Sequence, residues 1–233
     1  LEKLCSLLER QKHLLRDISH DLRTPLARQR IAIELANESG ADEELMASIL
    51  RQNERLEEMT GQILTLYRVT EAGGDIEREA IRPVHVINRV LRDAADYAEH
   101  QGVDCKLVAS PDSSGASVLG DEGLLQRAID NILQNALDHT PPGKAVHLGV
   151  SVSEGWLSLT VEDEGPGVPE ELIGHLFEPF FRADKSRGGM GWGLGLAIAR
   201  DIVSAHDGAI SAARGEQGGL RVTVRLPVFF GGR

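Results

Sequence analysis

Apolar residues recur every seven positions along the first part of the chain, in two successive series. The first series comprises Leu1, Leu8, Leu15 and Leu22 together with Leu4, Gln11, Ile18 and Pro25. The second comprises Ile49, Leu56 and Ile63 together with Leu45, Gln52, Met59 and Leu66. Between them, NESGADEE (37–44) is typical of a turn followed by the acidic start of a helix. The pattern predicts two amphipathic helices in an antiparallel hairpin.

A single hairpin of this kind covers only part of each apolar stripe. Pairing two hairpins into a four-helix bundle buries the remainder. We therefore expect a homodimer formed through residues 1–71. The alternative is a hairpin that packs on the rest of its own chain.

The hydrophobic pattern changes after the segment EAGGDIEREAIRP (71–83), whose paired glycines and mixed charge indicate a linker. Helical patterns follow at 84–100, 121–139, 169–175 and 194–206, and strand patterns follow at 103–109, 145–153, 156–162, 208–213 and 219–226. Asp121 is a candidate N-cap. We expect a helical domain over 1–71, a linker over 72–82, and a domain over 83–233 with strands on one side and helices on the other.

Composition and charge restrict the function classes. Of the 233 residues 41% are apolar and 26% charged, which is typical of a globular protein, and the formal net charge is −11. An acidic chain is a poor general nucleic-acid binder, so any phosphate group must be held locally. Cys5 and Cys105 match no metal-ligand spacing and are expected to be free thiols. No apolar run reaches transmembrane length, and the abrupt helical start suggests a fragment that lacks its upstream portion.

The first candidate for chemistry is the segment DISHDLRTPLAR (17–28). With Leu15 at heptad position a, His20 falls at f, on the face furthest from the apolar seam. Asp21 can accept the proton of one ring nitrogen and leave the other nucleophilic. Thr24, one turn later on the same face, can orient a water, and Pro25 is expected to bend the helix. The alternative is an inert surface histidine.

Two further segments suit a magnesium nucleotide. In NILQNALDH (131–139), Asn131 and Asn135 lie four apart on one helical face, where a carboxamide can help to hold hydrated Mg²⁺. In DEGPGVP (163–169), Asp163 follows a strand and can accept a hydrogen bond from an exocyclic amine such as that of adenine. Gly165 and Gly167 allow a ligand close to the backbone. Taken singly, each segment could instead be an ordinary surface feature or a glycine-rich turn.

The last segment is GGMGWGLGLAIA (188–199), whose glycines open a helix. The amide-rich N-terminus of such a helix can hold phosphate. No strand directly precedes it, so it is not a Rossmann turn. The preceding LFEPFFRADKSR (176–187) supplies aromatics and cations suited to a mobile lid. A buried aromatic cluster is the alternative for Phe177, Phe180 and Phe181.

In their order along the chain, these motifs resemble the catalytic core of the sensor histidine kinases of two-component systems. SHDLRTPL is similar to the H box of that family and NILQNALDHTP to its N box. VEDEGPGVP is similar to the first glycine box, LFEPFFRAD to the F box and GWGLGLAIA to the second glycine box. The resemblance covers nearly the whole chain, and the HDLRTPL form is most similar to the osmosensor and envelope-stress kinases.

The resemblance implies a dimerisation and phosphotransfer hairpin followed by an ATP-binding α/β sandwich of the gyrase, Hsp90 and histidine kinase type. It implies that His20 is the phosphoacceptor, that Asp21 is its base, and that Thr24 positions the water of a phosphatase reaction. ATP and Mg²⁺ are the implied cofactors, with Asn135 on the metal. The implied nucleotide-binding residues are Asn131, Asn135, His139, Asp163, Gly165, Gly167, Arg182, Lys185, Gly191, Gly193, Leu194 and Gly195.

The resemblance also implies partners and a location. The phosphoryl group would pass to an aspartate on the receiver domain of a response regulator, and no nucleic acid would be involved. A membrane anchor is implied upstream, which would make the chain the cytoplasmic portion of a bacterial inner-membrane protein.

Two residues depart from the family pattern. Asp138 stands where a basic residue is common, and an acid there would repel triphosphate unless it points away or a cation compensates; Lys144, Arg182, Lys185 and Arg187 are candidates. Trp192 stands where a small residue or threonine is usual. Two alternatives remain open: an ATPase of the gyrase, Hsp90 or mismatch-repair type, and a degenerate kinase that only binds or scaffolds.

Overall fold

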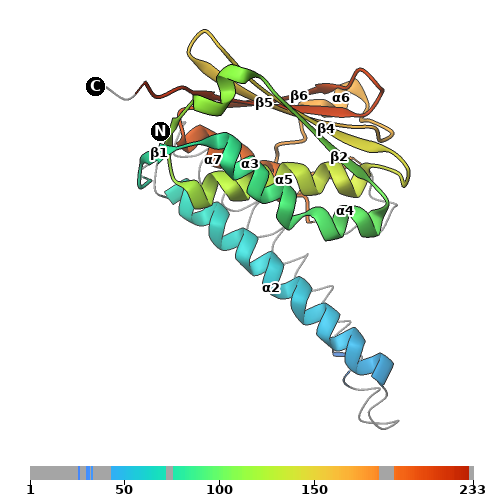
Figure 1. Cartoon of the computed structure of the whole chain (residues 1–233). Coiled ribbons are helices and arrows are strands. Elements are labelled where there is room, and N and C mark those ends of the chain that lie inside the picture. The colour runs from blue at the N-terminus through green and yellow to red at the C-terminus, as the bar shows by residue number, and fades with distance from the viewer. Residues whose placement is uncertain are drawn as a thin grey trace. The chain divides into compact units, whose positions relative to one another are not determined.

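The computed structural model describes residues 26, 30, 31, 33, 43–71, 76–183 and 192–230. The chain divides into two compact units, Leu1–Thr65 and Leu66–Arg233 (Figure 1). Helix α2 (Glu43–Glu71) carries the second heptad series. Within α2, Met59 is fully buried and Gln52 is buried, as their seam positions require. The whole of the first series lies outside the described residues. No described helix has the length and apolar character that crossing a bilayer demands.

A five-stranded sheet forms one layer of the second unit (Figure 1). Its strands, in spatial order, are β2 (Asp104–Ala109), β4 (Ala145–Ser153), β5 (Trp156–Asp163), β7 (Leu220–Pro227) and β6 (Ala209–Arg214). The β2–β4 pair is parallel and the other pairs are antiparallel. All five strands were predicted from alternation. The parallel pairing was not, because alternation carries no information about which strands are neighbours.

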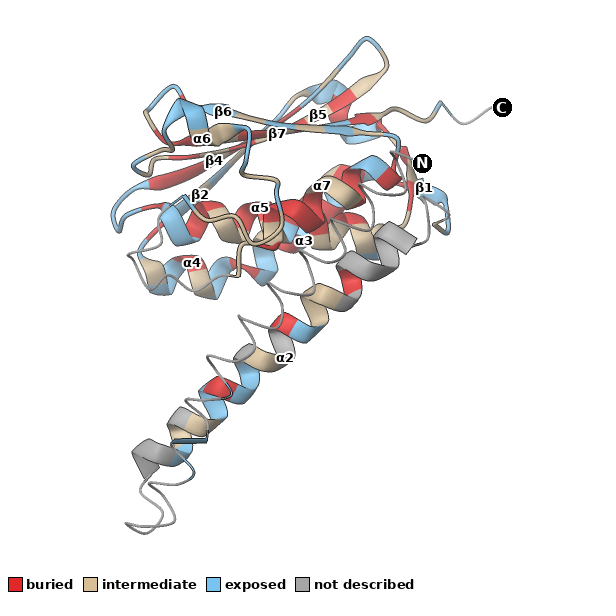
Figure 2. Cartoon of the chain, turned by 180° about the vertical axis from the view of Figure 1, so that it is seen from behind, coloured by how far each residue is buried: buried red, intermediate tan, exposed pale blue. Residues whose placement is uncertain are grey.

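Helices α3 (Pro83–Asp93), α5 (Glu122–His139) and α7 (Gly195–Ala205) cover one face of the sheet (Figure 1). Figure 2 shows that the buried residues gather between the two layers. Asp121 caps α5 by accepting a hydrogen bond from the Leu124 amide at 3.0 Å, which confirms the predicted N-cap. The helix expected over 84–100 is interrupted at Ala94, after which α4 (Ala95–Gln101) begins. The short helix α6 (Glu170–Ile173) follows Pro169, as predicted. The expected layered α/β fold is confirmed.

A second, two-stranded sheet was missed. Strand β1 (Glu79–Ile81) lies in the segment expected to be a linker and pairs antiparallel with β3 (Val118–Gly120). A single turn of 3₁₀ helix, η1 (Pro111–Gly115), precedes β3. Arg78 fixes the entry to β1, because its guanidinium donates to the Ala205 carbonyl at 2.9 Å and to Asp207 at 2.5 Å. Three-residue strands are too short to show a period. The domain limits at 71 and 83 stay a prediction.

Gly120 is the position where the core leaves least room for a side chain. His206 is 1% exposed, and its Nε2 accepts a hydrogen bond from the Asp121 amide at 3.0 Å while its Nδ1 donates to the Ile202 carbonyl at 2.7 Å. Burial lowers the pKa of His206, so the ring is held neutral in this arrangement. A methyl group at Gly120 would overlap this ring.

Replacing Gly120 by alanine is therefore expected to cost about 3 kcal/mol in the free energy of unfolding, since overpacking displaces a hydrogen-bonded ring. Denaturant unfolding measures this loss. Gly123→Ala is the matched control, because the nearest atom to its added methyl group is Asp121 Oδ1 at 3.4 Å. That change in the first turn of α5 should be neutral or stabilising by about 0.5 kcal/mol. Equal losses in the two variants would contradict the packing argument.

Candidate functional site

One face of α5 carries three of the predicted site residues. Asn131, Asn135 and His139 recur every four residues and so lie along the same side of the helix. The Asn131 Nδ2 atom is buried and has no hydrogen-bond partner within the described part of the chain. A buried amide donor without a partner is costly, so this position suits an acceptor from a ligand, such as a phosphate oxygen.

Asp163 lies at the end of β5, on the buried side of the sheet. The alternation of β5 buries Leu157, Leu159 and Val161 and then places this acid in the same row, only 3% exposed. Its Oδ1 accepts a hydrogen bond from the Gly165 amide at 2.8 Å, and its Oδ2 accepts one from the Leu220 amide at 3.2 Å. The carboxylate is thus held in one orientation, with lone pairs left for a ligand donor.

The ionisation of Asp163 reflects these contacts. Burial raises the pKa of Asp163, whereas the two backbone hydrogen bonds and the nearby His139 oppose the rise. The site therefore combines a desolvated carboxylate acceptor with neutral amide donors. An acceptor and donors of this kind suit a ligand that presents an exocyclic amine at one end and anionic oxygens at the other.

Gly165 and Gly167 shape the loop that follows β5. A methyl group at Gly165 would overlap the His139 carbonyl at the end of α5. Gly167 has φ +71°, and a methyl group there would overlap the Gly218 carbonyl. The sequence predicts that these glycines allow a ligand to approach the backbone closely. The structure adds a second reason, because the surrounding protein already leaves no room for a Cβ atom at either position.

The start of α7 completes the described part of the site. Gly195 opens the helix beside Asn131, so close that a methyl group on Gly195 would contact Asn131 Oδ1 at 3.7 Å. Leu194 is fully buried and precedes Gly195 as the N-cap residue of α7. Gly193, at φ +69°, packs against the backbone of Phe180 and Phe181.

Two contacts tie the segment before residue 184 to the segment after residue 191. The Phe180 amide donates to the Gly193 carbonyl at 2.9 Å, and Arg200 of α7 donates to the Phe177 carbonyl at 2.8 Å. The first part of the segment expected to be a lid, as far as Phe180, is therefore held by Gly193 and by Arg200 of α7. Phe177, Phe180 and Phe181 are half-buried.

The structure thus brings together nine of the predicted residues: Asn131, Asn135, His139, Asp163, Gly165, Gly167, Gly193, Leu194 and Gly195. Arg182, which directly follows Phe181 in the chain, is half-buried. The remaining predicted residues, His20, Asp21, Thr24, Lys185 and Gly191, lie outside the described residues.

Comparison with known families assigns both parts of the chain. Residues 120–229 match the family described as histidine kinase-, DNA gyrase B- and HSP90-like ATPase. Residues 10–72 match the His Kinase A (phospho-acceptor) domain. Sensor histidine kinase CpxA of Escherichia coli (strain K12) is 32% identical over 227 residues, which are 96% of this chain and 48% of that protein. The chain belongs to the sensor histidine kinase family.

Other members extend the likeness. Sensor histidine kinase TrcS of Mycobacterium tuberculosis (strain ATCC 25618 / H37Rv) is 34% identical over 230 residues, which are 94% of this chain and 44% of that protein. The chain thus spans about half the length of these relatives. Among solved structures, Acinetobacter baumannii histidine kinase AdeS shares the fold, with a TM-score of 0.73, 24% identity, and coverage of 91% of this chain and 98% of that one. The structure of full-length ShkA in complex with AMPPNP has a TM-score of 0.70 and is 25% identical. The match covers 95% of this chain and 47% of that one.

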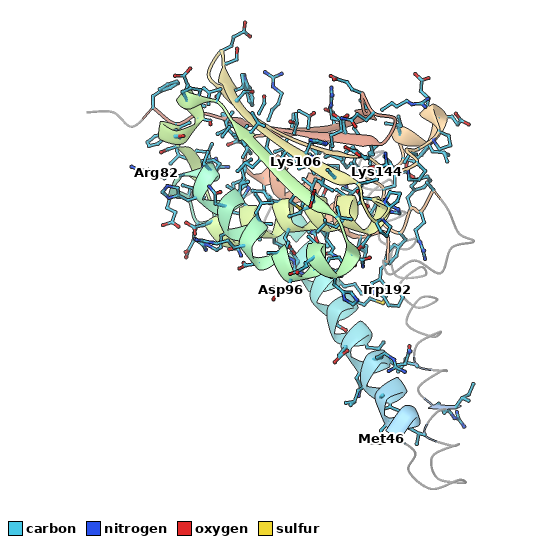
Figure 3. The ribbon with its side chains drawn as sticks, turned by 45° about the vertical axis from the view of Figure 1, so that its right-hand side comes forward. Met46, Arg82, Asp96, Lys106, Lys144 and Trp192 are labelled. Carbon is cyan, nitrogen blue, oxygen red and sulfur yellow. The ribbon has the colours of Figure 1, made fainter. Side chains whose placement is uncertain are left out.

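Asp138, which departs from the kinase family pattern, uses its carboxylate in hydrogen bonds to other side chains of its own domain. It accepts hydrogen bonds from the Tyr97 hydroxyl of α4 at 2.7 Å and from Gln134 Nε2 at 3.0 Å. Lys144, one proposed compensating cation, instead lies 3.7 Å from Glu164. Neutral donors, rather than that lysine, therefore balance the acid. Trp192, the second residue that departs from the family pattern, is half-buried and lies on the helical side of the sheet (Figure 3). Lys144 directly precedes β4.

One part of the site was missed in the sequence. The turn between β6 and β7, residues 215–219, packs against Asp163 and Gly167 and leads directly to the Leu220 amide that binds Asp163. The glycines in GEQGGL (215–220) signalled a turn, but its contact with the end of β5 depends on the order of strands in the sheet.

Proposed function

We propose that this chain is the catalytic core of a sensor histidine kinase, which phosphorylates His20 from ATP and then transfers the phosphoryl group to an aspartate of a response regulator. The observation that carries the proposal is the buried Asp163 carboxylate, held by the Gly165 and Leu220 amides, together with the buried Asn131 amide, which has no partner among the described residues. The match of residues 10–72 to a phospho-acceptor domain supports His20 as the acceptor.

The roles follow from the chemistry of each group. Asp163 would accept a hydrogen bond from the adenine amine, and Asn131 would donate to phosphate oxygens. The α7 N-terminus at Gly195 would add positive potential near the phosphates. Asn135 offers the carboxamide oxygen that Mg²⁺ prefers, and the ion would neutralise charge on the transferring phosphoryl group.

In the proposed phosphotransfer, each bond that forms to phosphorus is matched by one that breaks. The unprotonated ring nitrogen of His20 would form a bond to the γ-phosphorus while the bond to the β-phosphate oxygen breaks and ADP leaves. Asp21 would stabilise the proton on the other ring nitrogen. In the second step, the phosphoryl group would move from His20 to the receiver aspartate. We extend the proposal to dephosphorylation of the regulator, with Thr24 orienting the attacking water.

A second copy of the chain is the proposed dimer partner. Large apolar side chains of the helical unit remain exposed in the single chain: Leu26 is 50% exposed, Ile31 55%, Ile33 44%, Met46 47% and Leu50 58%. Exposed apolar surface of this kind marks an interface. A four-helix bundle of two copies would cover it. A membrane anchor upstream, with this chain on the cytoplasmic side, completes the proposal.

Incubation of the chain with γ-labelled ATP and Mg²⁺ tests the activity. We expect label on the protein that is lost in acid, retained in alkali, and passed to a receiver domain that carries its phosphoacceptor aspartate. Nucleotide hydrolysis with no protein label would favour an ATPase of the gyrase type. Absence of nucleotide binding would favour a scaffold.

A further inference from the structure

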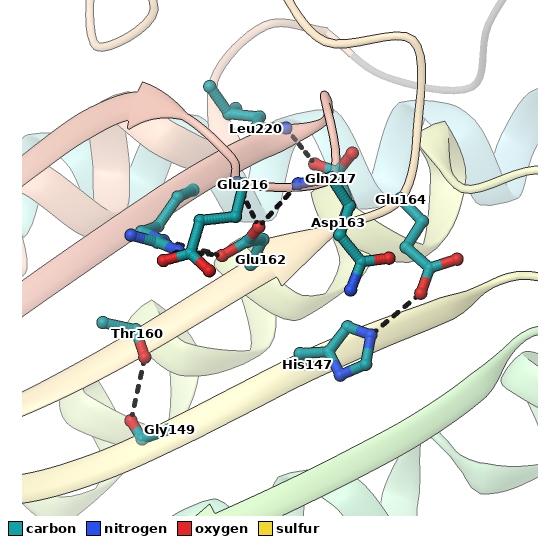
Figure 4. A network of polar contacts seen from close by, with 10 residues as sticks. His147, Gly149, Thr160, Glu162, Asp163, Glu164, Glu216, Gln217 and Leu220 are labelled. Atoms are coloured by element: carbon teal, nitrogen blue, oxygen red, sulfur yellow. Dashed lines mark hydrogen bonds and ion pairs between the residues drawn. The ribbon is translucent and has the colours of Figure 1, made fainter.

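The end of β5 places two neighbouring acids on opposite faces of the sheet. Asp163 points into the buried layer, and Glu162 points to the outer face, because successive residues of a strand alternate. Figure 4 shows both carboxylates reaching the same stretch of chain, residues 215–220. Glu162 plays no part in the nucleotide site as described above, yet its side chain is only 12% exposed.

Glu162 holds the 215–219 turn through both of its oxygens. Its Oε1 accepts hydrogen bonds from the Glu216 amide at 2.6 Å and from the Gln217 amide at 3.4 Å (Figure 4). Its Oε2 accepts from Arg221 Nε and Nη2, both at 2.6 Å. Hydrogen bonds to an ionised acceptor are among the stronger ones in proteins. Burial alone would raise the pKa of Glu162, but these donors outweigh it and hold the pKa below its ordinary value.

The same turn presses against the adenine end of the site. The residue after it, Leu220, donates its amide to Asp163 Oδ2 at 3.2 Å. A methyl group at Gly219 would overlap the Asp163 backbone and carboxylate, and one at Gly167 would overlap the Gly218 carbonyl. With no space between these backbones, a shift of the turn by a few tenths of an ångström moves the Asp163 carboxylate as well.

We propose that Glu162 is a positioning residue for adenine recognition, which fixes Asp163 by holding the 215–219 turn against it. The inference rests on the proposed binding of ATP at Asp163. Without the Glu162 carboxylate, the amides of Glu216 and Gln217 lose their acceptor. The Leu220 amide then holds Asp163 Oδ2 less firmly, while the Gly165 amide still holds Oδ1.

The phosphate end does not depend on this turn. Asn131 and Gly195 lie on α5 and α7, and no hydrogen bond among the described residues joins either one to residues 215–219. Loss of Glu162 should therefore weaken nucleotide binding and leave the transfer step intact. In kinetic terms, the KM for ATP rises while kcat stays unchanged.

Glu164 provides a matched control on the other side of Asp163. Its carboxylate lies 2.9 Å from His147 Nε2 and 3.7 Å from Lys144 Nζ, both on the β4 side (Figure 4). No hydrogen bond to the 215–219 turn involves it among the described residues. Glu164→Gln thus removes one charge next to Asp163 without touching the turn.

The test compares Glu162→Gln, Glu162→Ala and Glu164→Gln in the full chain by titration with a fluorescent ADP analogue. We expect the Kd to rise about 3-fold in Glu162→Gln and about 10-fold in Glu162→Ala, and to stay within 2-fold in Glu164→Gln. The preference for ATP over GTP should fall in the same order, because a displaced Asp163 discriminates the base less well. A purely structural role would lower the melting temperature and leave that preference unchanged.

Three outcomes would overturn the inference: unchanged affinity in a folded Glu162→Gln, unchanged base preference, or an equal loss in Glu164→Gln. If Glu162→Ala does not fold, the isosteric Glu162→Gln carries the test. The proposed function fails separately, since it requires acid-labile label. A wild-type chain that binds nucleotide without labelling refutes the kinase while the titrations still decide the role of Glu162.

Discussion

Replacing His20 by alanine is expected to abolish labelling of the chain from γ-labelled ATP, a loss of at least about 1000-fold if the ring is the nucleophile. The Kd for ADP should stay within 2-fold of the wild type, because Asp163 and Asn131, which are proposed to hold the nucleotide, lie in the separate ATP-binding unit. Gel autoradiography measures the first quantity and a fluorescence titration the second.

The first heptad series supplies a control for this experiment. His13 precedes His20 by one heptad and therefore occupies the same outward position f. Its neighbours differ, because Leu14 follows it where Asp21 follows His20. His13→Ala should keep full labelling. Label that persists on His20→Ala, or that disappears in both variants, would refute His20 as the phosphoacceptor.

Asp163→Asn is expected to raise the Kd for adenine nucleotides about 100-fold, since an isosteric amide removes a charged acceptor from a buried site. The wild-type carboxylate accepts from Gly165 and Leu220 and has lone pairs left for the base. In the variant, the new NH₂ group would face one of these backbone donors, or the adenine amine itself. Isothermal titration with ADP measures the change, and the preference for ATP over GTP should also decline.

Asp207→Asn is the control for that substitution. Asp207 lies in the same unit, pairs with Arg78 on the surface, and has a side chain that is 66% exposed. Its replacement should leave the Kd for ADP within 2-fold of the wild type. A folded Asp163→Asn variant whose affinity is within about 3-fold of the wild type would rule out Asp163 as the principal contact of the base.

The two acids at the end of β5 have different proposed roles in the nucleotide site. Asp163 would read the base and Glu162 would hold the turn that orients it, so that one strand end serves both tasks from opposite faces. Only Asp163 could be predicted from the sequence, because it ends a strand shortly before two glycines, whereas an outward glutamate is ordinary. The role of Glu162 emerges only from the strand order that places the turn between β6 and β7 beside β5.

Features that depend on local pattern could be predicted from the amino-acid sequence alone. Alternation gave the five strands of the main sheet, helical periodicity gave α5 and α7, and the Asp121 cap marked the start of α5. The ordered motifs gave the family. These features can be predicted without the tertiary structure, because hydrogen bonding within a helix and alternation along a strand are set by neighbouring residues.

The contacts between residues distant in the chain became known only from the three-dimensional structure. It set β2 parallel to β4, formed the β1–β3 pair from segments too short to show a period, and packed the 215–219 turn on Asp163. It also turned Asp138 toward Tyr97 and closed Gly120 against His206. Each of these contacts joins residues far apart in the chain. Such contacts depend on how the layers pack and on the space left between them, which no local period records.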